Sequence, residues 1–501
     1  MVQVHWRKNI FIINSNIRFV ILEVKFMQNI KFGTGGWRAV VGEDFTYENV
    51  CRVAQGISQY MIETNQSDRP IVIGYDNRYL SPEASNWLTN IFLNNGISVL
   101  QITQSVPTPL TMHMVKKQHL YFGIEVTASH NPYFYNGIKV FVEEGRDAPI
   151  EVTNRLEEII ANISLKDIKQ FTNDTPTGVL TSIDNPFGDF VNDILNVLNI
   201  DAIKARGLKI LVDPMYGSGY YPLNMILGTA QCATNVIHSH RDVSFGSRLP
   251  APTESTLTEL KKLVVEGGYD LGIALDGDGD RLGIIDSNGR YVSANEILCL
   301  LYNYLVTVKG WSGPVVRNYA TTHMLDKIAE SKKEICYEVP IGFKHISSKI
   351  DEVDAVLGGE SSGGLTVRGH IHGKDSIYAA ALFVEMLSVT GSTIAELLDE
   401  LYSNYGFHFM EECNLTFSKD TKDEIEDRIF VKKELPNYDF SEVVKVSYSD
   451  GCKIYFKNGF VICRFSGTEP LLRIFAESDS KETALEYINI FKNFILVDKR
   501  T

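Results

Sequence analysis

The stretch Ile71-Val72-Ile73-Gly74-Tyr75-Asp76 is a short apolar run that ends in polar residues, which is the pattern of a buried strand. Residues 85–95 follow with helical spacing, and the apolar run 97–102 predicts the next strand. A strand, a helix and a strand in this order predict a parallel sheet with a right-handed crossover. The first part of the chain is therefore predicted to be an α/β unit.

The same rhythm begins twice more along the chain. The run Leu208-Lys209-Ile210-Leu211-Val212-Asp213 opens a second set of elements, and a third set is predicted around 313–325 and 355–359. We therefore expect three α/β sections that share one architecture.

The last hundred residues have a different pattern. Two strands are predicted at 443–448 and 453–456, joined by the turn Ser449-Asp450-Gly451. This predicts a smaller α+β section at the C-terminal end. The polar stretch 169–185 is predicted to be the first linker, and a second boundary is predicted near 402–406.

Composition limits the kinds of partner. The 501 residues carry a net charge of −14, which argues against binding to nucleic acid or to a membrane through a polybasic segment. The seven cysteines are scattered and form no C-x-x-C pair, so reduced thiols and a cytoplasmic location are expected.

The first 26 residues need a separate interpretation. Basic residues precede a short apolar run, but charged residues interrupt it and no small-residue cleavage site follows. We expect Met27 to be the natural start, and residues 1–26 to be a loose tail or a translation artefact.

The first of four motifs that can carry chemistry is Thr127-Ala128-Ser129-His130-Asn131-Pro132, after a predicted strand at 121–126. The end of a parallel strand is where such sheets bind ligands, and small neighbours leave the Ser129 hydroxyl reachable. Taken alone, an ordinary polar turn explains this motif better. The G-x-S-x-G elbow of a hydrolase is absent, so a hydrolase nucleophile is not predicted.

The second motif is Asp276-Gly277-Asp278-Gly279-Asp280-Arg281, after the apolar run 271–275. Three carboxylates spaced by two residues can converge on one hard cation, because the two glycines permit the backbone to curl. An EF-hand is excluded, since Arg281 stands at the required glycine and Ser287 at the required glutamate. Three like charges so close repel each other, which favours a metal site over a solvated turn.

The third and fourth motifs suit a sugar and a phosphate. In Gly358-Gly359-Glu360-Ser361-Ser362-Gly363-Gly364, the Glu360 and Ser362 side chains can bond vicinal hydroxyls, although a flexible loop is an equal explanation. The stretch Arg464-Phe465-Ser466-Gly467-Thr468-Glu469-Pro470, with Arg473 beyond it, suits a phosphate dianion. A hairpin turn is the equal alternative there.

In this order, the four motifs resemble those of the α-D-phosphohexomutase family, the phosphoglucomutase and phosphomannomutase group. Residues 32–38, FGTGGWR, also resemble its opening motif, and the resemblance extends from about Ile30 onward. It implies an α/β, four-domain, heart-shaped molecule of three topologically similar α/β domains plus a smaller α+β C-terminal domain. The expected boundaries are an N-terminal extension at 1–26, domain I at 27–185, domain II at 186–292, domain III at 293–403 and domain IV at 404–501.

The resemblance also implies roles. It implies that Ser129 is phosphorylated in the active enzyme and helps to bind Mg²⁺ together with Asp276, Asp278 and Asp280. The general base stays open among three residues that complete the implied catalytic set, namely Arg38, His130 and Lys139. The implied substrate-binding set is Lys344, Glu360, Ser362, Arg464, Ser466, Gly467, Thr468 and Arg473.

The activity that the resemblance implies is the reversible interconversion of glucose 1-phosphate and glucose 6-phosphate. Phosphoserine would give its phosphoryl group to the sugar phosphate, and a hexose 1,6-bisphosphate, which is also the activator, would turn over before Ser129 takes a phosphoryl group back. Thr127 disfavours a phosphoglucosamine mutase, which usually has serine there. Gly364 resembles the phosphoglucomutase form of the sugar loop, while Ser361 departs from its usual glutamate or methionine.

Several alternatives remain open at this level. A phosphomannomutase, a dual-specificity enzyme or a phosphopentomutase of the same family would carry the same motifs. A non-catalytic sugar-phosphate sensor would be expected to have lost one of them. A metal phosphatase of another fold leaves three motifs unexplained. A monomer or a weak homodimer is expected.

Overall fold

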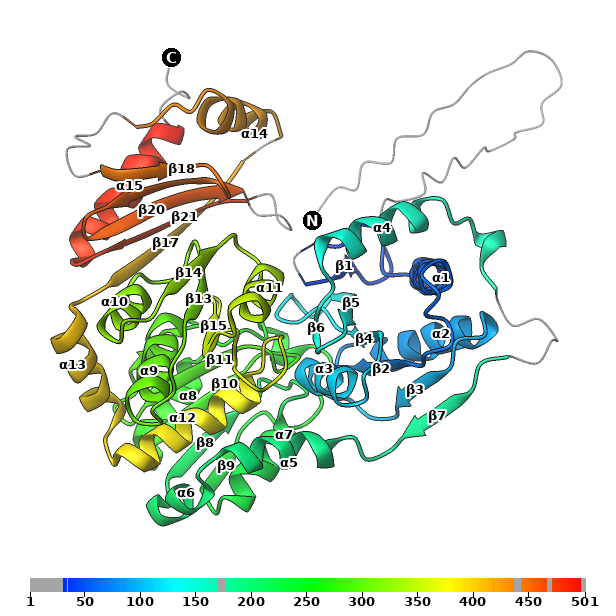
Figure 1. Ribbon diagram of the computed structural model, residues 1–501, viewed down its shortest axis with the longest axis horizontal. Coiled ribbons are helices and arrows are strands. Elements are labelled where there is room, and N and C mark those ends of the chain that lie inside the picture. The colour runs from blue at the N-terminus through cyan, green and yellow to red at the C-terminus, as the bar shows by residue number, and fades with distance from the viewer. Residues whose placement is uncertain are drawn as a thin grey trace.

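The computed structural model describes residues 30–33, 35–169, 177–417, 419–436, 443–465 and 471–496, and the predictions for residues 1–26 and Met27 lie outside them. Figure 1 shows four units. The first, in blue and cyan, lies on the right of the view and the fourth, in orange and red, at the upper left, and the second and third, in green and yellow, lie below the fourth and beside the first.

The first unit is a seven-stranded sheet covered by helices. Along the sheet the strands run β1-β5-β4-β2-β3-β7, with β6 beside β5. The strands are β1 (Trp37–Val40), β2 (Ile71–Tyr75), β3 (Val99–Ile102), β4 (Phe122–Val126), β5 (Tyr135–Val142), β6 (Arg146–Asp147) and β7 (Leu180–Ile183). The helices are α1 (Tyr47–Glu63), α2 (Ser81–Asn94), α3 (Thr108–Lys117) and α4 (Ile150–Ala161).

The second and third units repeat this layout with fewer strands. The second contains β8 (Lys209–Asp213), β9 (Ala233–Val236), β10 (Leu271–Leu275), β11 (Leu282–Asp286), β12 (Tyr291–Val292), α5 (Phe187–Val197), α6 (Ile200–Arg206), α7 (Tyr220–Thr229) and α8 (Thr258–Gly267). The third contains β13 (Val315–Asn318), β14 (Cys336–Val339), β15 (Leu357–Gly359), β16 (Leu365–Val367), α9 (Ala294–Thr307), α10 (Met324–Ser331), α11 (Phe343–Val353), α12 (Ser376–Thr390) and α13 (Ile394–Tyr405).

One strand pattern is common to these three sheets. In the first, β2 lies between β3 and β4 and is parallel to both, while β5 is antiparallel to β4. The second sheet repeats the pattern with β8, β9, β10 and β11. The third repeats it with β13, β14, β15 and β16. The loop between the last two strands of each set is therefore topologically equivalent in all three units.

That equivalent loop carries a predicted motif each time. The Ser129 motif lies between β4 and β5, the aspartate motif between β10 and β11, and the Glu360 motif between β15 and β16. Loops at the carboxyl ends of parallel strands gather at one edge of their sheet. Each of the three units therefore holds its own motif loop at the equivalent edge of its sheet.

The fourth unit is a fully antiparallel sheet in the order β17-β21-β20-β19-β18. Its elements are β17 (Phe409–Thr416), α14 (Lys419–Glu426), β18 (Val443–Ser447), β19 (Cys452–Phe456), β20 (Gly459–Phe465), β21 (Leu471–Ser478) and α15 (Lys481–Leu496). The α15 side chains of Tyr487, Ile488 and Phe491 are buried in its core. The predicted fold class, three topologically similar α/β units plus a smaller α+β unit in a heart-shaped molecule, is confirmed.

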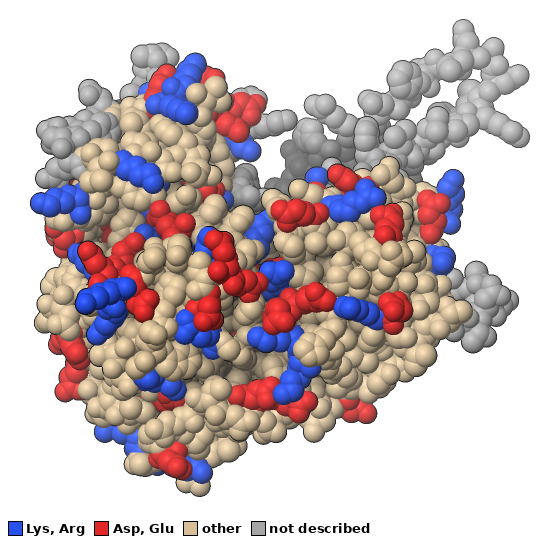
Figure 2. Space-filling model, viewed as in Figure 1, with Lys and Arg blue, Asp and Glu red and all other residues tan. Residues whose placement is uncertain are grey.

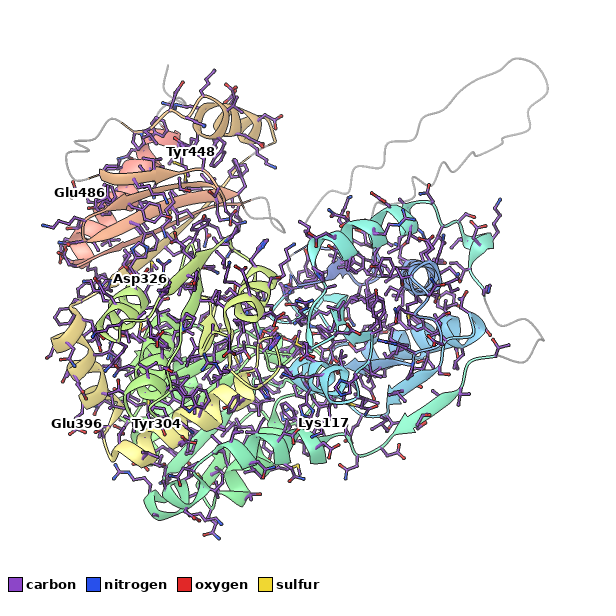
Figure 3. The ribbon with its side chains drawn as sticks, viewed as in Figure 1. Lys117, Tyr304, Asp326, Glu396, Tyr448 and Glu486 are labelled. Carbon is purple, nitrogen blue, oxygen red and sulfur yellow. The ribbon has the colours of Figure 1, made fainter. Side chains whose placement is uncertain are left out.

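A buried polar network joins the third and fourth units. Lys453 of β19 donates to Glu338 Oε1 at 2.5 Å, and Arg317 donates to the same oxygen at 2.7 Å. Arg317 also binds Asp326 of α10, which is labelled in Figure 3. Since each buried charge has an opposite partner, the network fixes where the fourth unit sits on the third.

Helix α12 is apolar on all sides because it is surrounded by protein. It packs against α6, α7 and α9, and its one buried acid, Glu385, accepts from Tyr304 Oη at 2.5 Å. Among the described residues no single helix is long and apolar enough to cross a membrane, and only the sharply bent pair α12–α13 passes that test jointly. Figure 2 shows acidic and basic side chains interspersed over one face of the molecule.

The structure corrects two details of the predicted elements. The stretch 169–185 is not simply a linker, because β7 lies within it and adds to the first sheet beside β3. Its side chains are mostly exposed, so the sequence lacks the apolar pattern of a strand. The helix predicted at 85–95 begins earlier, at Ser81, since Pro82 is tolerated in a first turn. The predicted domain boundaries stay predictions.

Candidate active site

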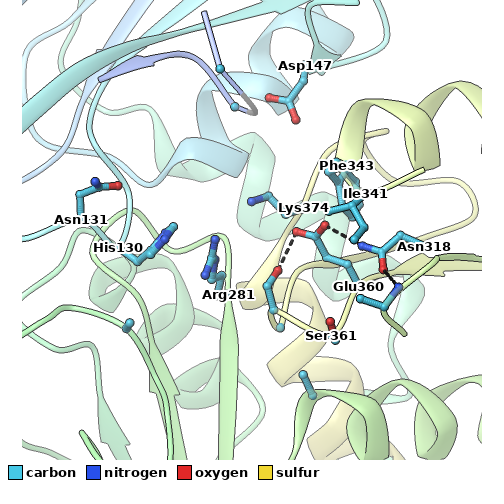
Figure 4. A pocket seen from close by; sticks show the side chains of 18 of the residues that line it. His130, Asn131, Asp147, Arg281, Asn318, Ile341, Phe343, Glu360, Ser361 and Lys374 are labelled. Carbon is cyan, nitrogen blue, oxygen red and sulfur yellow. Dashed lines mark hydrogen bonds between the residues drawn. The ribbon is translucent and has the colours of Figure 1, made fainter. Parts of the chain in front are cut away.

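A cavity of about 650 Å³ lies between the four units. His130 and Asp147 reach it from the first unit, Arg281 from the second, and Glu360 and Lys374 from the third, as Figure 4 shows. The fourth unit contributes a smaller set of lining residues, Glu412, Asn414, Arg464, Arg473 and Phe475. Motifs more than 300 positions apart in the sequence therefore share one site.

Ser129 is fully buried in the loop after β4, and its neighbour His130 lines the cavity. Its backbone has a φ of 53°, a left-handed conformation that is uncommon for serine. Its hydroxyl donates to Asp276 Oδ2 at 3.1 Å and lies 3.2 Å from His130 Nδ1. The acceptor serine and the aspartate loop, predicted to be neighbours, are in direct contact.

The three aspartates converge as predicted. One carboxylate oxygen from each aspartate lies within 4.8 Å of the other two, and all three residues are buried. Asp276 Oδ1 accepts the backbone N–H groups of Asp280 and Arg281, which holds the curl of the loop. The Oδ1 atoms of Asp278 and Asp280 are buried without a hydrogen-bond partner. Because buried oxygens are rarely left unpaired, this donor set fits a hard cation such as Mg²⁺.

Cations from two other units offset part of this negative charge. Lys139 Nζ lies 2.6 Å from Asp278 Oδ2 and 2.7 Å from Asp280 Oδ2, and Lys374 Nζ lies 3.0 Å from the same Asp280 oxygen. Burial opposes the charge on Lys139, but the two carboxylates prevail and raise its pKa. Burial and the charges of Asp278 and Asp280 raise the pKa of Asp276 well above its usual value. Negative charge is thus crowded at this loop, even with the two lysines beside it.

A basic corner adjoins Ser129. Arg38 donates to Asn131 Oδ1 at 2.7 Å, and the Nε atoms of Arg38 and Arg281 are buried without a hydrogen-bond partner, although Arg281 Nε lies 3.9 Å from Asp280 Oδ1. Burial, together with the charges of Arg281, Arg38 and Lys374, holds the pKa of His130 well below its usual value. The His130 imidazole is therefore neutral at pH 7, beside a hydroxyl and two guanidinium groups.

The predicted sugar loop faces the opposite side of the cavity. Glu360 Oε1 accepts from Ser362 Oγ at 2.7 Å, and Glu360 Oε2 accepts from Asn318 Nδ2 at 3.3 Å, as the dashed lines in Figure 4 mark. Lys344, at the start of α11, also lines the cavity. Glu360 is thus pre-oriented by its neighbours, with its carboxylate directed at the space where a ligand would lie.

The predicted phosphate clamp is described only in part. Arg464 and Arg473 are cross-strand partners on β20 and β21, and both line the cavity. Arg464 Nε lies 3.2 Å from Asp450 Oδ1, and the other Asp450 oxygen accepts the Ile341 N–H at 2.7 Å. The remaining predicted clamp residues lie outside the described residues, namely Ser466, Gly467 and Thr468.

Four family models match the chain in consecutive order. Each is described as a phosphoglucomutase/phosphomannomutase domain: alpha/beta/alpha domain I at residues 29–167, domain II at 188–289, domain III at 293–405 and the C-terminal domain at 419–492.

The chain belongs to the phosphoglucomutase/phosphomannomutase family.

Curated relatives of this family match over almost their whole length. A phosphoglucomutase/phosphomannomutase of Thermococcus kodakarensis is 29% identical over 92% of this chain and 97% of its own. A probable phosphoglucosamine mutase of Pyrococcus furiosus is 30% identical over 91% and 95%. A crystal structure titled "putative phosphomannomutase" from Thermus thermophilus, 24% identical, superposes with a TM-score of 0.80 over 93% of this chain and 99% of that one. The family's enzymes are phosphohexomutases, so this chain is an enzyme of that class.

Sequence reasoning missed several residues of this phosphohexomutase site. Asp147 and Asn318 line the cavity without having been predicted, and Arg281 was used only to exclude an EF-hand. Asn318 ends β13, and Asp76 stands at the equivalent place directly after β2. Asn318 donates to Glu360 of the sugar loop, and Asp76 accepts from Thr127 of the Ser129 loop. A polar residue at the end of a buried strand is a sequence signal that could have found Asn318.

Proposed function

We propose that this phosphohexomutase interconverts glucose 1-phosphate and glucose 6-phosphate through a phosphorylated Ser129. The observation that carries the proposal is the contact between Ser129 Oγ and the Asp276 carboxylate, buried directly behind a cavity that is lined by His130, by the sugar loop and by two clamp arginines. A nucleophile beside a cation site, together with a phosphate clamp on the adjoining cavity, is what phosphoryl transfer needs.

The residues divide the work by charge. Arg38 and Arg281 would bind the phosphoryl group carried by Ser129, and Arg464 and Arg473 would hold the phosphate at the far end of the sugar. Asp276, Asp278 and Asp280 would hold Mg²⁺, which would offset negative charge on the phosphoryl group during transfer. Closure of the cavity by the fourth domain would keep water from the phosphoserine.

Contacts in the structure favour one of the three predicted residues as the general base. A base must be neutral or anionic to accept the proton of the attacking hydroxyl. Lys139 is held charged between two carboxylates, and Arg38 is a guanidinium, so both are poor acceptors. The neutral imidazole of His130, next to Ser129, is the best placed of the three predicted residues.

The glucose assignment rests on Thr127, which disfavours a phosphoglucosamine mutase, and on the glycine-terminated loop 359–364, which resembles the phosphoglucomutase form. One observation favours a second candidate, an amino sugar phosphate. Asp147 and Glu360 are both carboxylates on the cavity wall, and two carboxylates suit an ammonium substituent. Relatives named as phosphoglucosamine mutases belong to the same set of matches.

A four-substrate assay tests the proposal. The purified protein, with Mg²⁺ and glucose 1,6-bisphosphate, is given the 1-phosphates of glucose, mannose, glucosamine and ribose, and the 6-phosphate products (5-phosphate for ribose) are quantified. We expect kcat/KM for glucose 1-phosphate to exceed each other value by at least about tenfold, a difference of ~1.4 kcal/mol. A higher value for glucosamine 1-phosphate would replace glucose by the second candidate.

A further inference from the structure

Arg78 is a fully buried arginine that does not line the cavity. Its side chain is 0% exposed, and its guanidinium group lies directly behind the Ser129 loop. Four backbone carbonyl groups of that loop accept from its two terminal nitrogens. Nη2 donates to the carbonyls of Ser129 at 2.5 Å and Asn131 at 2.7 Å, and Nη1 donates to those of Pro132 at 2.9 Å and Tyr135 at 3.0 Å.

Asp76 completes this arrangement from the end of β2. Its Oδ2 lies 3.3 Å from Arg78 Nε and accepts from Thr127 Oγ1 at 2.6 Å. Thr127 Oγ1 in turn accepts the N–H of Ser129 at 2.8 Å. The N–H and the C=O of Ser129 are therefore both tied, one through Thr127 and one through Arg78, to a single buried ion pair.

This double tie has a conformational consequence. Ser129 has a left-handed backbone, which sterics disfavour for any residue with a side chain, so the loop needs an external restraint to keep it. A planar fork that binds several carbonyls at once supplies that restraint, and a lysine ammonium cannot reproduce its geometry. The ring of Phe245 from the second domain lies under the guanidinium, 4.9 Å from it, and closes the remaining side.

We propose that Arg78, paired with Asp76, is a positioning residue that fixes the Ser129 hydroxyl in line for phosphoryl transfer. This inference rests on the proposed function, because it gives the ion pair a role in the chemistry of the phosphoserine. In each turnover Ser129 gives up one phosphoryl group and takes back another. Its Oγ atom must therefore be aligned with the transferring phosphorus in both steps. A misplacement of about 1 Å costs on the order of 100-fold in rate.

The test compares two arginine-to-lysine variants of the same domain. Arg78→Lys keeps a buried cation beside Asp76 but loses the fork. Arg52→Lys is the matched control, since Arg52 is also buried and donates to two backbone carbonyls, those of Ile163 and Ile160, away from Ser129. For each protein we measure the melting temperature, kcat, KM, and the rate at which glucose 1,6-bisphosphate phosphorylates the Ser129 peptide, followed by mass spectrometry.

We expect Arg78→Lys to lower kcat about 100-fold with KM within about threefold, and to slow phosphorylation of Ser129 by a similar factor. Arg52→Lys should also lower the melting temperature, because it loses buried hydrogen bonds to carbonyl groups, while kcat stays within about threefold. Equal phosphorylation rates in wild type and Arg78→Lys would overturn the inference, as would a loss of kcat in Arg52→Lys as large as in Arg78→Lys.

Two further outcomes keep the inference separate from the proposed function. If wild-type Ser129 takes no phosphoryl group from the bisphosphate, the proposed function itself fails. If Arg78→Lys does not fold, Asp76→Asn tests the other partner of the ion pair. Asparagine has nearly the same size and shape as aspartate but lacks its charge. The same selective fall in kcat is expected there, and an unchanged kcat would overturn the inference.

Discussion

The Ser129 hydroxyl donates to Asp276 Oδ2 at 3.1 Å, although the two residues are 147 positions apart and belong to different domains. No local feature of either loop creates this contact, since each loop is built by its own sheet. The packing of domain I on domain II creates it. Thr108 supports the same junction, because its hydroxyl donates to Asp278 Oδ2 at 2.5 Å. The candidate site thus depends on a domain interface as much as on its motifs.

Ser129→Ala is expected to remove turnover while leaving the fold intact. The variant loses the oxygen that would accept the phosphoryl group, so kcat should fall by at least about 10³-fold. Its melting temperature should stay within a few degrees of wild type, because only one hydroxyl is lost. A coupled mutase assay and a thermal scan give both values.

Ser58→Ala is the matched control for this prediction. Ser58 is a buried serine of the same domain, and its hydroxyl donates to the Ala54 carbonyl within α1. It should change the melting temperature similarly and leave kcat unaltered. Wild-type activity in Ser129→Ala would remove Ser129 from the mechanism.

Asp276→Asn should separate metal binding from the folding of the aspartate loop. Asparagine keeps the Oδ1 acceptor for the Asp280 and Arg281 amides but removes the carboxyl group. Burial and the charges of Asp278 and Asp280 already raise the pKa of that carboxyl group, so the folded chain disfavours its charged form. In EDTA the variant should therefore melt no lower than wild type. Saturating Mg²⁺ should raise the wild-type melting temperature by about 2–4 °C and the variant's much less.

Mn²⁺ binding, followed by electron paramagnetic resonance, checks the same point without any assay of activity. The control is Asp286→Asn at the far end of β11, where the carboxylate only accepts backbone N–H groups of a turn. That variant should bind Mn²⁺ as wild type does. Equal Mn²⁺ affinity in Asp276→Asn and wild type would contradict a metal site at this loop.

Arg38 and Arg281 should act on one shared phosphoryl group. Both side chains line the cavity together with His130, whose pKa is lowered by burial and then by the charges of Arg281 and Arg38. Arg38→Gln and Arg281→Gln should each lower kcat/KM by about 10²-fold. The double variant should lose clearly less than the product of the two, because the interactions are not independent.

An arginine on the surface of domain I supplies the control for that cycle. Arg155 pairs with Glu63 and Glu158 on exposed helix faces, and Arg155→Gln should leave kcat/KM unchanged. Strict multiplication of the Arg38 and Arg281 effects would show that the two side chains serve different phosphates.

The sequence was informative wherever one loop contains a whole function. The aspartate triplet and the strand before it were predictable, because the ligand spacing and the apolar run are both local. The shared topology was also predictable, since a buried parallel strand is a short apolar run in all three units. The strand β7 was not, because an exposed edge strand needs no apolar pattern.

What the sequence could not supply was the pairing of distant side chains. Nothing local to Lys139 predicts that it bridges Asp278 and Asp280, and so its proposed role as a base weakened only when the contact was seen. The role of Arg78 could not be predicted either, because its acceptors are backbone carbonyl groups, which every residue carries. Such contacts arise from domain packing and from loop shape, which single motifs do not encode.

The joint between domains III and IV predicts how stability depends on pH. Glu477 of β21 is fully buried, and its Oε1 accepts from the His323 N–H at 3.0 Å and lies 3.0 Å from His408 Nδ1. Burial alone would raise its pKa, but the hydrogen bond and charge of His408 outweigh burial and lower the pKa of Glu477 to about 2. A depressed folded pKa means that the unfolded chain binds more protons as pH falls.

Wild type should therefore lose this contribution as pH falls from about 4.5 to about 2, and Glu477→Gln should not. The depression corresponds to roughly 3 kcal/mol, which is present at pH 7 and vanishes below pH 2. Urea unfolding at several pH values should show the variant about 2–3 kcal/mol less stable at pH 7, with the gap narrowing toward pH 3. Glu486→Gln, on the exposed face of α15 and labelled in Figure 3, is the control and should show no such gap. A gap of constant size from pH 7 to pH 3 would mean that Glu477 contributes through packing rather than through its charge.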